Sequence, residues 1–267
     1  MTITEIFILA ILQGLTEFLP VSSSAHLILP SQLLNWPDQG LAFDVGVHVG
    51  TLIAVVFYFR QDVCNMLCAF FNSLRNRQSV DGKTAWFIIT ATIPALISGF
   101  LLHDLIDHFG RSLLVIAATT MIFGALLWFA DTRGNPQKKL SELTLKEALL
   151  IGFAQALALI PGTSRSGITM TAALMAGFSR DAAAKFSFYL SIPIILAAGS
   201  YKGLELASSE LLVRWDMVIC GVVLSAAVAF TCIHYFLIWL ERVGMLPFVI
   251  YRFILGLTLL AVYFSSV

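Results

Sequence analysis

Charged residues are scarce in this sequence, and their scarcity excludes an ordinary soluble fold. Only 12% of the 267 residues are Asp, Glu, Lys or Arg, whereas 58% are hydrophobic, so one soluble core could not cover the apolar surface. The 16 basic and 16 acidic residues cancel, which argues against a nucleic-acid partner. The composition therefore predicts an integral membrane protein that crosses the bilayer several times.

Familiar site motifs are also missing. The four cysteines form no CxxC pair and have no histidine at ligand spacing, so they are interpreted as small apolar residues. The sequence contains no Walker A loop, no Gly-x-Ser-x-Gly elbow and no HExxH helix. These absences exclude the common templates of soluble enzymes. Gln13 and Glu17 interrupt the first apolar run, so no cleavable signal peptide is expected.

Long hydrophobic runs are abundant instead. Six are long enough to cross a bilayer, which takes roughly 17 to 25 helical residues. They are expected near residues 41–59, 84–102, 112–130, 183–201, 214–239 and 247–264. Segments 3–35 and 147–178 differ, because each is an apolar helix that stops at a proline, passes through Ser, Thr and Gly, and resumes as a second short helix. Both predict re-entrant hairpins with tips facing protein or a wet cavity, since lipid cannot hydrogen-bond the backbone.

The positions of lysine and arginine predict the orientation. Eleven of the 16 basic residues fall in four connections, which are therefore expected to be cytoplasmic: 60–83, 131–146, 179–185 and 241–246. Six spans then place both termini outside. The first hairpin would enter from the outer face and the second from the cytoplasm, so that the two tips meet near the middle of the membrane.

An internal echo predicts two repeats. Gln13 and Pro20 precede Val-Ser-Ser-Ser, and Gln155 and Pro161 precede Gly-Thr-Ser-Arg, each after an apolar helix. Residues 1–130 and 147–267 would each hold one hairpin and three spans, joined by a cytoplasmic linker at 131–146. Because three is odd, the halves are inverted relative to one another. The predicted fold class is all-α integral membrane, with six transmembrane helices plus two re-entrant helical hairpins in an inverted-topology repeat.

The first broken segment carries candidate catalytic groups. Glu17 lies one turn after Gln13 on a helix face, and no basic residue lies within a turn of it. An ionisable residue at membrane depth is costly and usually functional. His26 follows three serines that supply a candidate nucleophile and a cap for the next helix: Ser22, Ser23 and Ser24. Acid, hydroxyl and imidazole together predict an active site.

The second broken segment predicts an anion site. Arg165 lies at a helix start, where its planar fork and the backbone N–H groups suit an anion with several oxygens. The residues beside it that are predicted to bind substrate are Gly162, Thr163, Ser164, Ser166 and Thr169. The alternative is that Arg165 pairs with an interior acid, for which Glu17 is the candidate.

Three further polar residues receive lesser predictions. Asp44 and His48 share a helix face near the outer surface and are expected at the rim of a cavity. Arg252 lies about two turns into the last span and is expected to snorkel inward.

Both motifs resemble the signature motifs of the bacterial undecaprenyl-diphosphatase family, the bacitracin-resistance phosphatases. The likeness covers residues 13–26 and 161–169 and extends to Asp44 and to the late Pro-Phe-x-Ile-Tyr-Arg at 247–252. It implies an inner-membrane enzyme that converts undecaprenyl diphosphate to the monophosphate carrier used for peptidoglycan, with a site open to the periplasm. It also implies a divalent cation, Mg²⁺ or Ca²⁺, near Glu17. The catalytic residues implied are Glu17, Ser23, His26 and Arg165, with Gln13 at the first position of the family's (E/Q)xxxE element. Gln13, Ser22 and Ser24 are predicted to bind substrate.

Several alternatives stay open at this point. Either Ser23, deprotonated by His26 or Glu17, attacks the terminal phosphorus, or one of those groups activates water. The competing function is a lipid-carrier flippase or transporter, because inverted repeats with broken helices are typical of alternating access. A phosphatidic-acid-type phosphatase would require a histidine after Ser-Arg, and residues 169–181 contain none. The oligomeric state is open, with a homodimer as one option.

Overall fold

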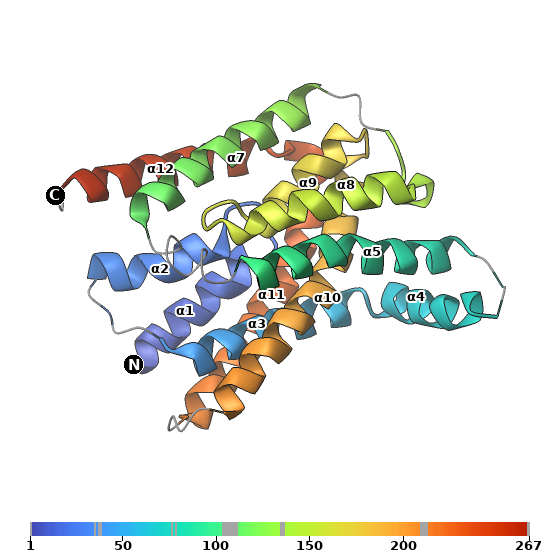
Figure 1. The fold of residues 1–267 in the computed structure, drawn as a ribbon. Helices are drawn as coiled ribbons and strands as arrows, with labels where there is room; N and C mark the ends of the chain where they lie inside the picture. The colour runs from blue at the N-terminus through green and yellow to red at the C-terminus, as the bar shows by residue number, and fades with distance from the viewer. Residues whose placement is uncertain are drawn as a thin grey trace.

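A computed structural model describes residues 2–34, 36, 39–75, 77, 79–102, 112–133, 137–208 and 213–265 (Figure 1). Within these ranges the chain is helical and contains no strand. Six helices are long and apolar enough to cross a membrane: α3 (Leu41–Tyr58), α5 (Val80–Leu101), α7 (Leu113–Arg133), α10 (Arg180–Ala207), α11 (Trp215–Val243) and α12 (Leu246–Ser265). The predicted all-α fold with six spans is confirmed.

The two broken segments are confirmed as helix–break–helix units. The first consists of α1 (Ile3–Thr16) and α2 (Ser23–Leu34). The second consists of α8 (Leu145–Ala156), a 3₁₀ turn at Leu157–Leu159, and α9 (Arg165–Met175). Their entry into the bilayer from opposite faces stays a prediction.

The two hairpins begin with the same device. The Thr2 hydroxyl accepts a hydrogen bond from the Glu5 backbone N–H, and the Glu5 carboxylate accepts one from the Thr2 N–H, which makes a capping box for α1. Thr144 and Glu147 form the same box at the start of α8. In each hairpin a glutamine follows the capping threonine by eleven residues, Gln13 in α1 and Gln155 in α8. The paired capping boxes agree with the predicted repeat, whose division of the chain stays a prediction.

Residues 60–83 form more than the charged connection expected from the sequence. They contain the helix α4 (Arg60–Ser73), which packs along α5. Val63, Met66 and Phe70 recur at helical spacing, with Met66 buried and the Phe70 ring 4.9 Å from that of Trp86 between centroids. The four basic residues of this stretch indicate a polar connection, but α4 also carries an apolar stripe that packs on α5.

Helices from the two halves pack against one another throughout. α1 packs on α11, and its counterpart α8 packs on α5. The most extensively packed span pairs are α3 with α11 and α7 with α12, and the latter two helices run side by side in Figure 1. Neither hairpin is held only by the spans of its own half.

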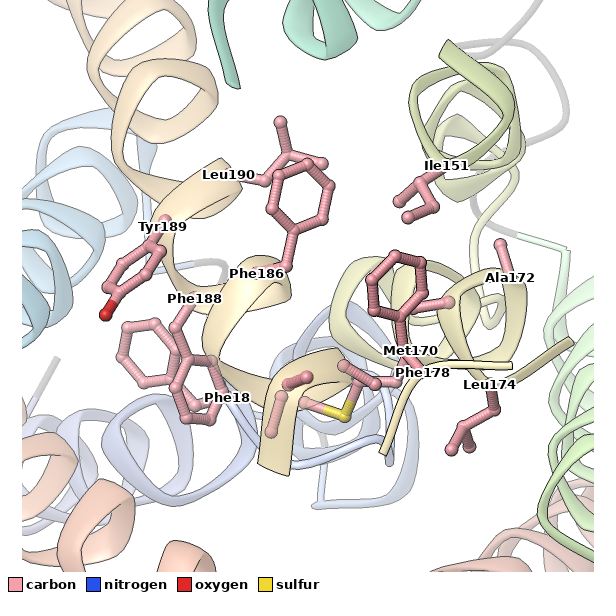
Figure 2. Close-up of a cluster of buried hydrophobic side chains, with 14 of the residues drawn as sticks. Phe18, Ile151, Met170, Ala172, Leu174, Phe178, Phe186, Phe188, Tyr189 and Leu190 are labelled. Atoms are coloured by element: carbon pink, nitrogen blue, oxygen red, sulfur yellow. The ribbon is translucent and has the colours of Figure 1, made fainter. Parts of the chain in front are cut away.

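A buried apolar cluster includes side chains of both hairpins (Figure 2). It combines side chains from α8, α9 and α10 with Phe18, which directly follows Glu17 in the chain. The Phe18 and Phe188 rings meet edge to face with centroids 5.3 Å apart. Because Phe18 is wholly buried, this packing fixes the backbone that carries Glu17.

Lys138, in the predicted linker at 131–146, is hydrogen-bonded and ion-paired to the second hairpin and the turn after it. The Lys138 N–H donates to the Gly177 carbonyl at 3.1 Å, and the Ser179 N–H donates to the Lys138 carbonyl at 3.0 Å. The Lys138 ammonium also pairs with Glu147 in the first turn of α8. Partial burial raises the pKa of the Glu147 carboxyl, but hydrogen bonds from Lys138 and Thr144 outweigh burial and hold that pKa below its usual range.

Candidate active site

The two tips turn in the same unusual way. Ser22 and Ser164 have φ angles of 74° and 71°, in the left-handed region that non-glycine residues rarely adopt. In each tip the strained serine bonds to the hydroxyl two residues later, Ser22 to Ser24 and Ser164 to Ser166, both at 3.2 Å. The next helix begins immediately after each strained residue. Ser23 and Arg165 therefore occupy matching first positions of α2 and α9.

A fully buried arginine from the last span ties both tips together. Arg252 donates to the carbonyls of Pro20 at 3.2 Å, Gly162 at 3.0 Å and Thr163 at 3.0 Å, and to Thr120 on α7 at 2.9 Å. Its side chain is 0% exposed. The prediction that Arg252 snorkels was wrong, because these carbonyls of two broken helices satisfy the guanidinium inside the protein.

Glu17 lies at the centre of the polar groups that the tips bring together. Its Oε1 accepts a hydrogen bond from Arg165 Nη2 at 2.7 Å. Its Oε2 accepts from Ser23 Oγ at 2.8 Å and from Gln13 Nε2 at 3.0 Å. The carboxylate is only 8% exposed, so these donors replace the water that it loses. The pairing of Arg165 with Glu17, which the sequence offered as the alternative to an anion site, is present in the structure.

The Arg165 guanidinium is positioned from several sides. It lies over the Phe18 ring at 5.9 Å, and its Nη1 donates to the Ser187 carbonyl of α10 at 3.4 Å. The neighbouring Ser166 Oγ donates across the interface to the Leu19 carbonyl of the first tip at 2.8 Å. The side chain is 14% exposed, which leaves part of the fork open to a ligand.

A cavity of about 430 Å³ opens beside this pair. Among the predicted site residues its walls include Glu17, Ser22, Ser23, Ser24, Ser164 and Arg165. The polar residues that line it in addition are Asp44, His48, Gln155 and Lys202. Hydroxyls, one buried acid and a guanidinium facing a common space can bind an oxyanion and act on it.

His26 lies apart from this group. Its Nδ1 is 2.7 Å from the Ser22 carbonyl, and its Nε2 contacts the Tyr251 hydroxyl. The imidazole stacks on the Tyr251 ring and does not line the cavity. Both ring nitrogens are therefore engaged, Nδ1 by the strained turn at Ser22 and Nε2 by Tyr251 of α12. Its predicted role as a base for Ser23 stays a prediction that this geometry does not favour.

The remaining predicted substrate-binding residues do not line the cavity: Gln13, Gly162, Thr163, Ser166 and Thr169. Gln13 holds Glu17, and Thr169 bonds to Ser187 and to backbone carbonyls of its own helix. Gly162 presents its carbonyl to Arg252 and Thr120. Thr163 is wholly buried. Their contact with substrate stays a prediction, and their present contacts support the tips.

His48 takes the place beside Glu17 that the sequence suggested for His26. Its Nε2 is 3.8 Å from Glu17 Oε2, and its Nδ1 is 2.7 Å from the Asp44 carbonyl. The expectation that Asp44 and His48 border a cavity is confirmed. The sequence signal for His48 was its place one turn after Asp44 in an apolar helix. Its contact with Glu17 could not be read from that signal, because the two residues lie 31 positions apart in the chain.

The carboxylates of the site fit a cation only together with a substrate. Among the described residues no three His, Cys, Asp or Glu side chains form a metal-binding group. Glu17 and Asp44 nevertheless border the same cavity. Mg²⁺ commonly takes one or two carboxylates and completes its shell with substrate phosphates and water. Glu17 and Asp44 fit this coordination by two carboxylates and a substrate phosphate.

Comparison with known proteins gives one consistent result. The family model described as bacitracin resistance protein BacA matches residues 6–258. A protein of Saccharophagus degradans named undecaprenyl-diphosphatase is 57% identical over 261 residues, which cover 98% of each chain. Undecaprenyl-diphosphatase 1 of Pseudoalteromonas translucida is 59% identical over 97% of this chain and 98% of its own. A Chromohalobacter salexigens undecaprenyl-diphosphatase is 58% identical over 94% of this chain and 96% of its own.

Proposed function

The chain belongs to the family of the bacitracin resistance protein BacA, and on that premise we propose that its Glu17–Arg165 site hydrolyses undecaprenyl diphosphate to undecaprenyl phosphate and inorganic phosphate. The observation that carries the proposal is the cavity in which an acid and a hydroxyl of one tip meet a guanidinium of the other. The reaction recycles the lipid carrier for peptidoglycan synthesis and agrees with the bacitracin resistance in the family's name.

Arg165 is the proposed clamp for the terminal phosphate. Its guanidinium can bind two phosphoryl oxygens at once and opposes the charge that develops on them in the transition state. In the structure it is paired with Glu17. A diphosphate entering the cavity would therefore share Arg165 with an acid that is already positioned beside Ser23.

Ser23 is the proposed nucleophile. Its hydroxyl donates to Glu17 Oε2 at 2.8 Å, so the carboxylate can accept the proton as the oxygen attacks the terminal phosphorus. The P–O bond to the bridging oxygen breaks, and undecaprenyl phosphate leaves with that oxygen. Water then attacks the phosphoserine and releases inorganic phosphate. Direct attack by a water activated at Glu17 is the alternative that Ser23→Ala would separate.

We propose Glu17, with Asp44 nearby, as the protein ligand of a divalent cation, Mg²⁺ or Ca²⁺. When bound, the cation would neutralise charge on the diphosphate. Removal by chelator should abolish phosphate release, and added Mg²⁺ should restore it. Release that persists in excess chelator would remove the cation from the reaction.

We also propose that the protein lies in the inner membrane with its cavity open to the periplasm. The cavity is lined by Leu41 and Asp44 in the first turn of α3 and by Lys202 near the end of α10. The distribution of lysine and arginine predicts that both of these helix ends are outer ends. Reporter fusions at Lys138 and Lys202 should report the cytoplasm and the periplasm respectively. A homodimer stays a prediction.

Phosphate release from undecaprenyl diphosphate by the purified protein in detergent tests the function. The wild type and Glu241→Ala, which removes an exposed acid of α11, should both release phosphate, whereas Glu17→Ala should not. A wild type that releases none but moves the lipid across vesicles would favour the transporter instead. Equal release by Glu17→Ala would contradict the proposed site.

A further inference from the structure

Gln155 is a buried amide that the rest of the described protein leaves without a hydrogen bond. Its side chain is 1% exposed, and within the described residues neither Nε2 nor Oε1 has a partner. Leaving a buried donor or acceptor unpaired is unfavourable, and native proteins carry few such groups. An amide with both ends unpaired therefore requires an explanation.

The matching residue of the first hairpin has a different environment. Gln13 occupies the same place after its capping box, and its Nε2 donates to Glu17, four residues later. The residue four positions after Gln155 is Leu159, which offers no side-chain acceptor. The amide that holds the acid in one hairpin is thus unused in the other.

Gln155 faces the active-site cavity. It lines the cavity together with Ser164 and Arg165, which belong to the same hairpin. Ile151, one turn earlier on α8, instead points into the apolar cluster (Figure 2). The α8 helix therefore contributes one polar group to the cavity where its apolar face ends.

We propose that Gln155 is a substrate-binding residue whose Nε2 donates a hydrogen bond to a phosphoryl oxygen of the diphosphate. This inference rests on the proposed function and adds a contact that neither signature motif contains. Phosphoryl oxygens at neutral pH are acceptors, and an amide N–H that has lost water and found no protein acceptor is a matched donor. The neighbouring Arg165 supplies the charge that brings such an anion to this wall.

Kinetics and stability together test the proposal. Gln155→Met keeps the volume and removes the unpaired amide, so its melting temperature in detergent should rise by about 2 °C or more. Its KM for undecaprenyl diphosphate should rise by about 10- to 100-fold, with kcat close to that of the wild type. Ile151→Met, a buried substitution on the same helix, should leave KM unchanged.

Inorganic pyrophosphate gives a readout that does not depend on turnover. It should raise the melting temperature of the wild type and of Ile151→Met, and raise that of Gln155→Met much less at the same concentration. If Gln155→Met fails to fold, Gln155→Glu preserves the shape and places a carboxylate against the phosphate, so it should bind pyrophosphate more weakly still.

Two results would overturn the proposal. One is a KM for Gln155→Met within about twofold of the wild type, and the other is equal stabilisation of both proteins by pyrophosphate. A wild type that releases no phosphate but shows the expected pyrophosphate difference would defeat the proposed hydrolysis and leave the Gln155 contact supported.

Discussion

At the scale of single residues, Glu17 and Arg165 compensate each other's charge in a largely buried ion pair. Their atoms are 2.7 Å apart, and both side chains are largely withdrawn from solvent. Removing one partner from a buried pair leaves an uncompensated charge, which is more damaging than replacing both. The same contact that stabilises the tips thus aligns the groups that would act on a diphosphate.

Two substitutions of Arg165 should distinguish the catalytic effect of its charge from that of its planar, two-pronged shape. Arg165→Ala is expected to lower kcat by on the order of 10³-fold, because the transition-state charge loses its clamp. Arg165→Lys keeps the charge without the planar fork, so its kcat should lie between those of the wild type and Arg165→Ala. Arg214→Ala removes an exposed arginine whose partner is Asp216 and should behave as the wild type in the phosphate-release assay. Near-normal turnover by Arg165→Ala would contradict the clamp.

The sequence could predict some of these residues and not others. Glu17, Ser23 and Arg165 stand out because each interrupts an apolar run beside a helix break. Gln155 and His48 lie within apolar helices, and their importance depends on neighbours distant in the chain. His26 was predicted as a base from its proximity in sequence to Ser23, but the helix turns its ring toward Tyr251.

At the scale of elements, the broken helices are the features that the sequence predicts best. Proline, glycine and clustered serines in an apolar run leave few conformations other than a turn. The strained φ angles of Ser22 and Ser164 were not predictable, since serine normally avoids this region. They are held by contacts between the tips, among them the Ser166 bond to the Leu19 carbonyl.

Two glycines with nearly equal φ angles test how tightly the second tip is held. Gly162 and Gly177 have φ of 89° and 88°. A Cβ on Gly162 would lie 2.2 Å from Thr119 Oγ1 and 2.5 Å from the Ile116 carbonyl, whereas one on Gly177 would meet nothing within 4 Å. Gly177→Ala should cost about 1 kcal/mol of unfolding free energy from backbone strain alone.

Gly162→Ala carries the same strain plus a clash with backbone and should be clearly less stable and less active than Gly177→Ala. Thermal unfolding in detergent and phosphate release on the same preparations would measure both. Equal losses from the two substitutions would indicate that the tip can move away from α7 without penalty.

At the scale of the whole molecule, the halves are interlocked. α1 packs on α11 and α8 on α5, so each hairpin is received by the opposite half. These pairings, the paired capping boxes and the paired serine turns agree with an inverted repeat, although the division at residues 131–146 stays a prediction. Which helices pair could not be predicted, because apolar faces in lipid carry little pairing information.

Arg252 provides a test of this interlocking. Arg252→Met should lower the free energy of unfolding by about 3 kcal/mol or more, because four buried carbonyls on two tips and α7 lose the hydrogen bond from the guanidinium. Arg252→Lys should lose less, since an ammonium can still reach part of the set. Unfolding would be followed by near-ultraviolet circular dichroism in detergent. A change below about 0.5 kcal/mol for Arg252→Met would contradict its role as the tie between tips.

Because each hairpin packs on a helix of the other half, the protein should be able to assemble from two separate fragments. A fragment ending at Arg133 would contain Glu17 and Ser23 but lack the α11 face on which α1 rests, and a fragment starting at Gln137 would contain Arg165 but lack the α5 face that receives α8. Either fragment alone would expose the helix faces that pack against the other fragment. Coexpressed in one cell, the two should restore each other, and complementation of this kind would mark the enzyme as a covalent fusion of mutually dependent subunits.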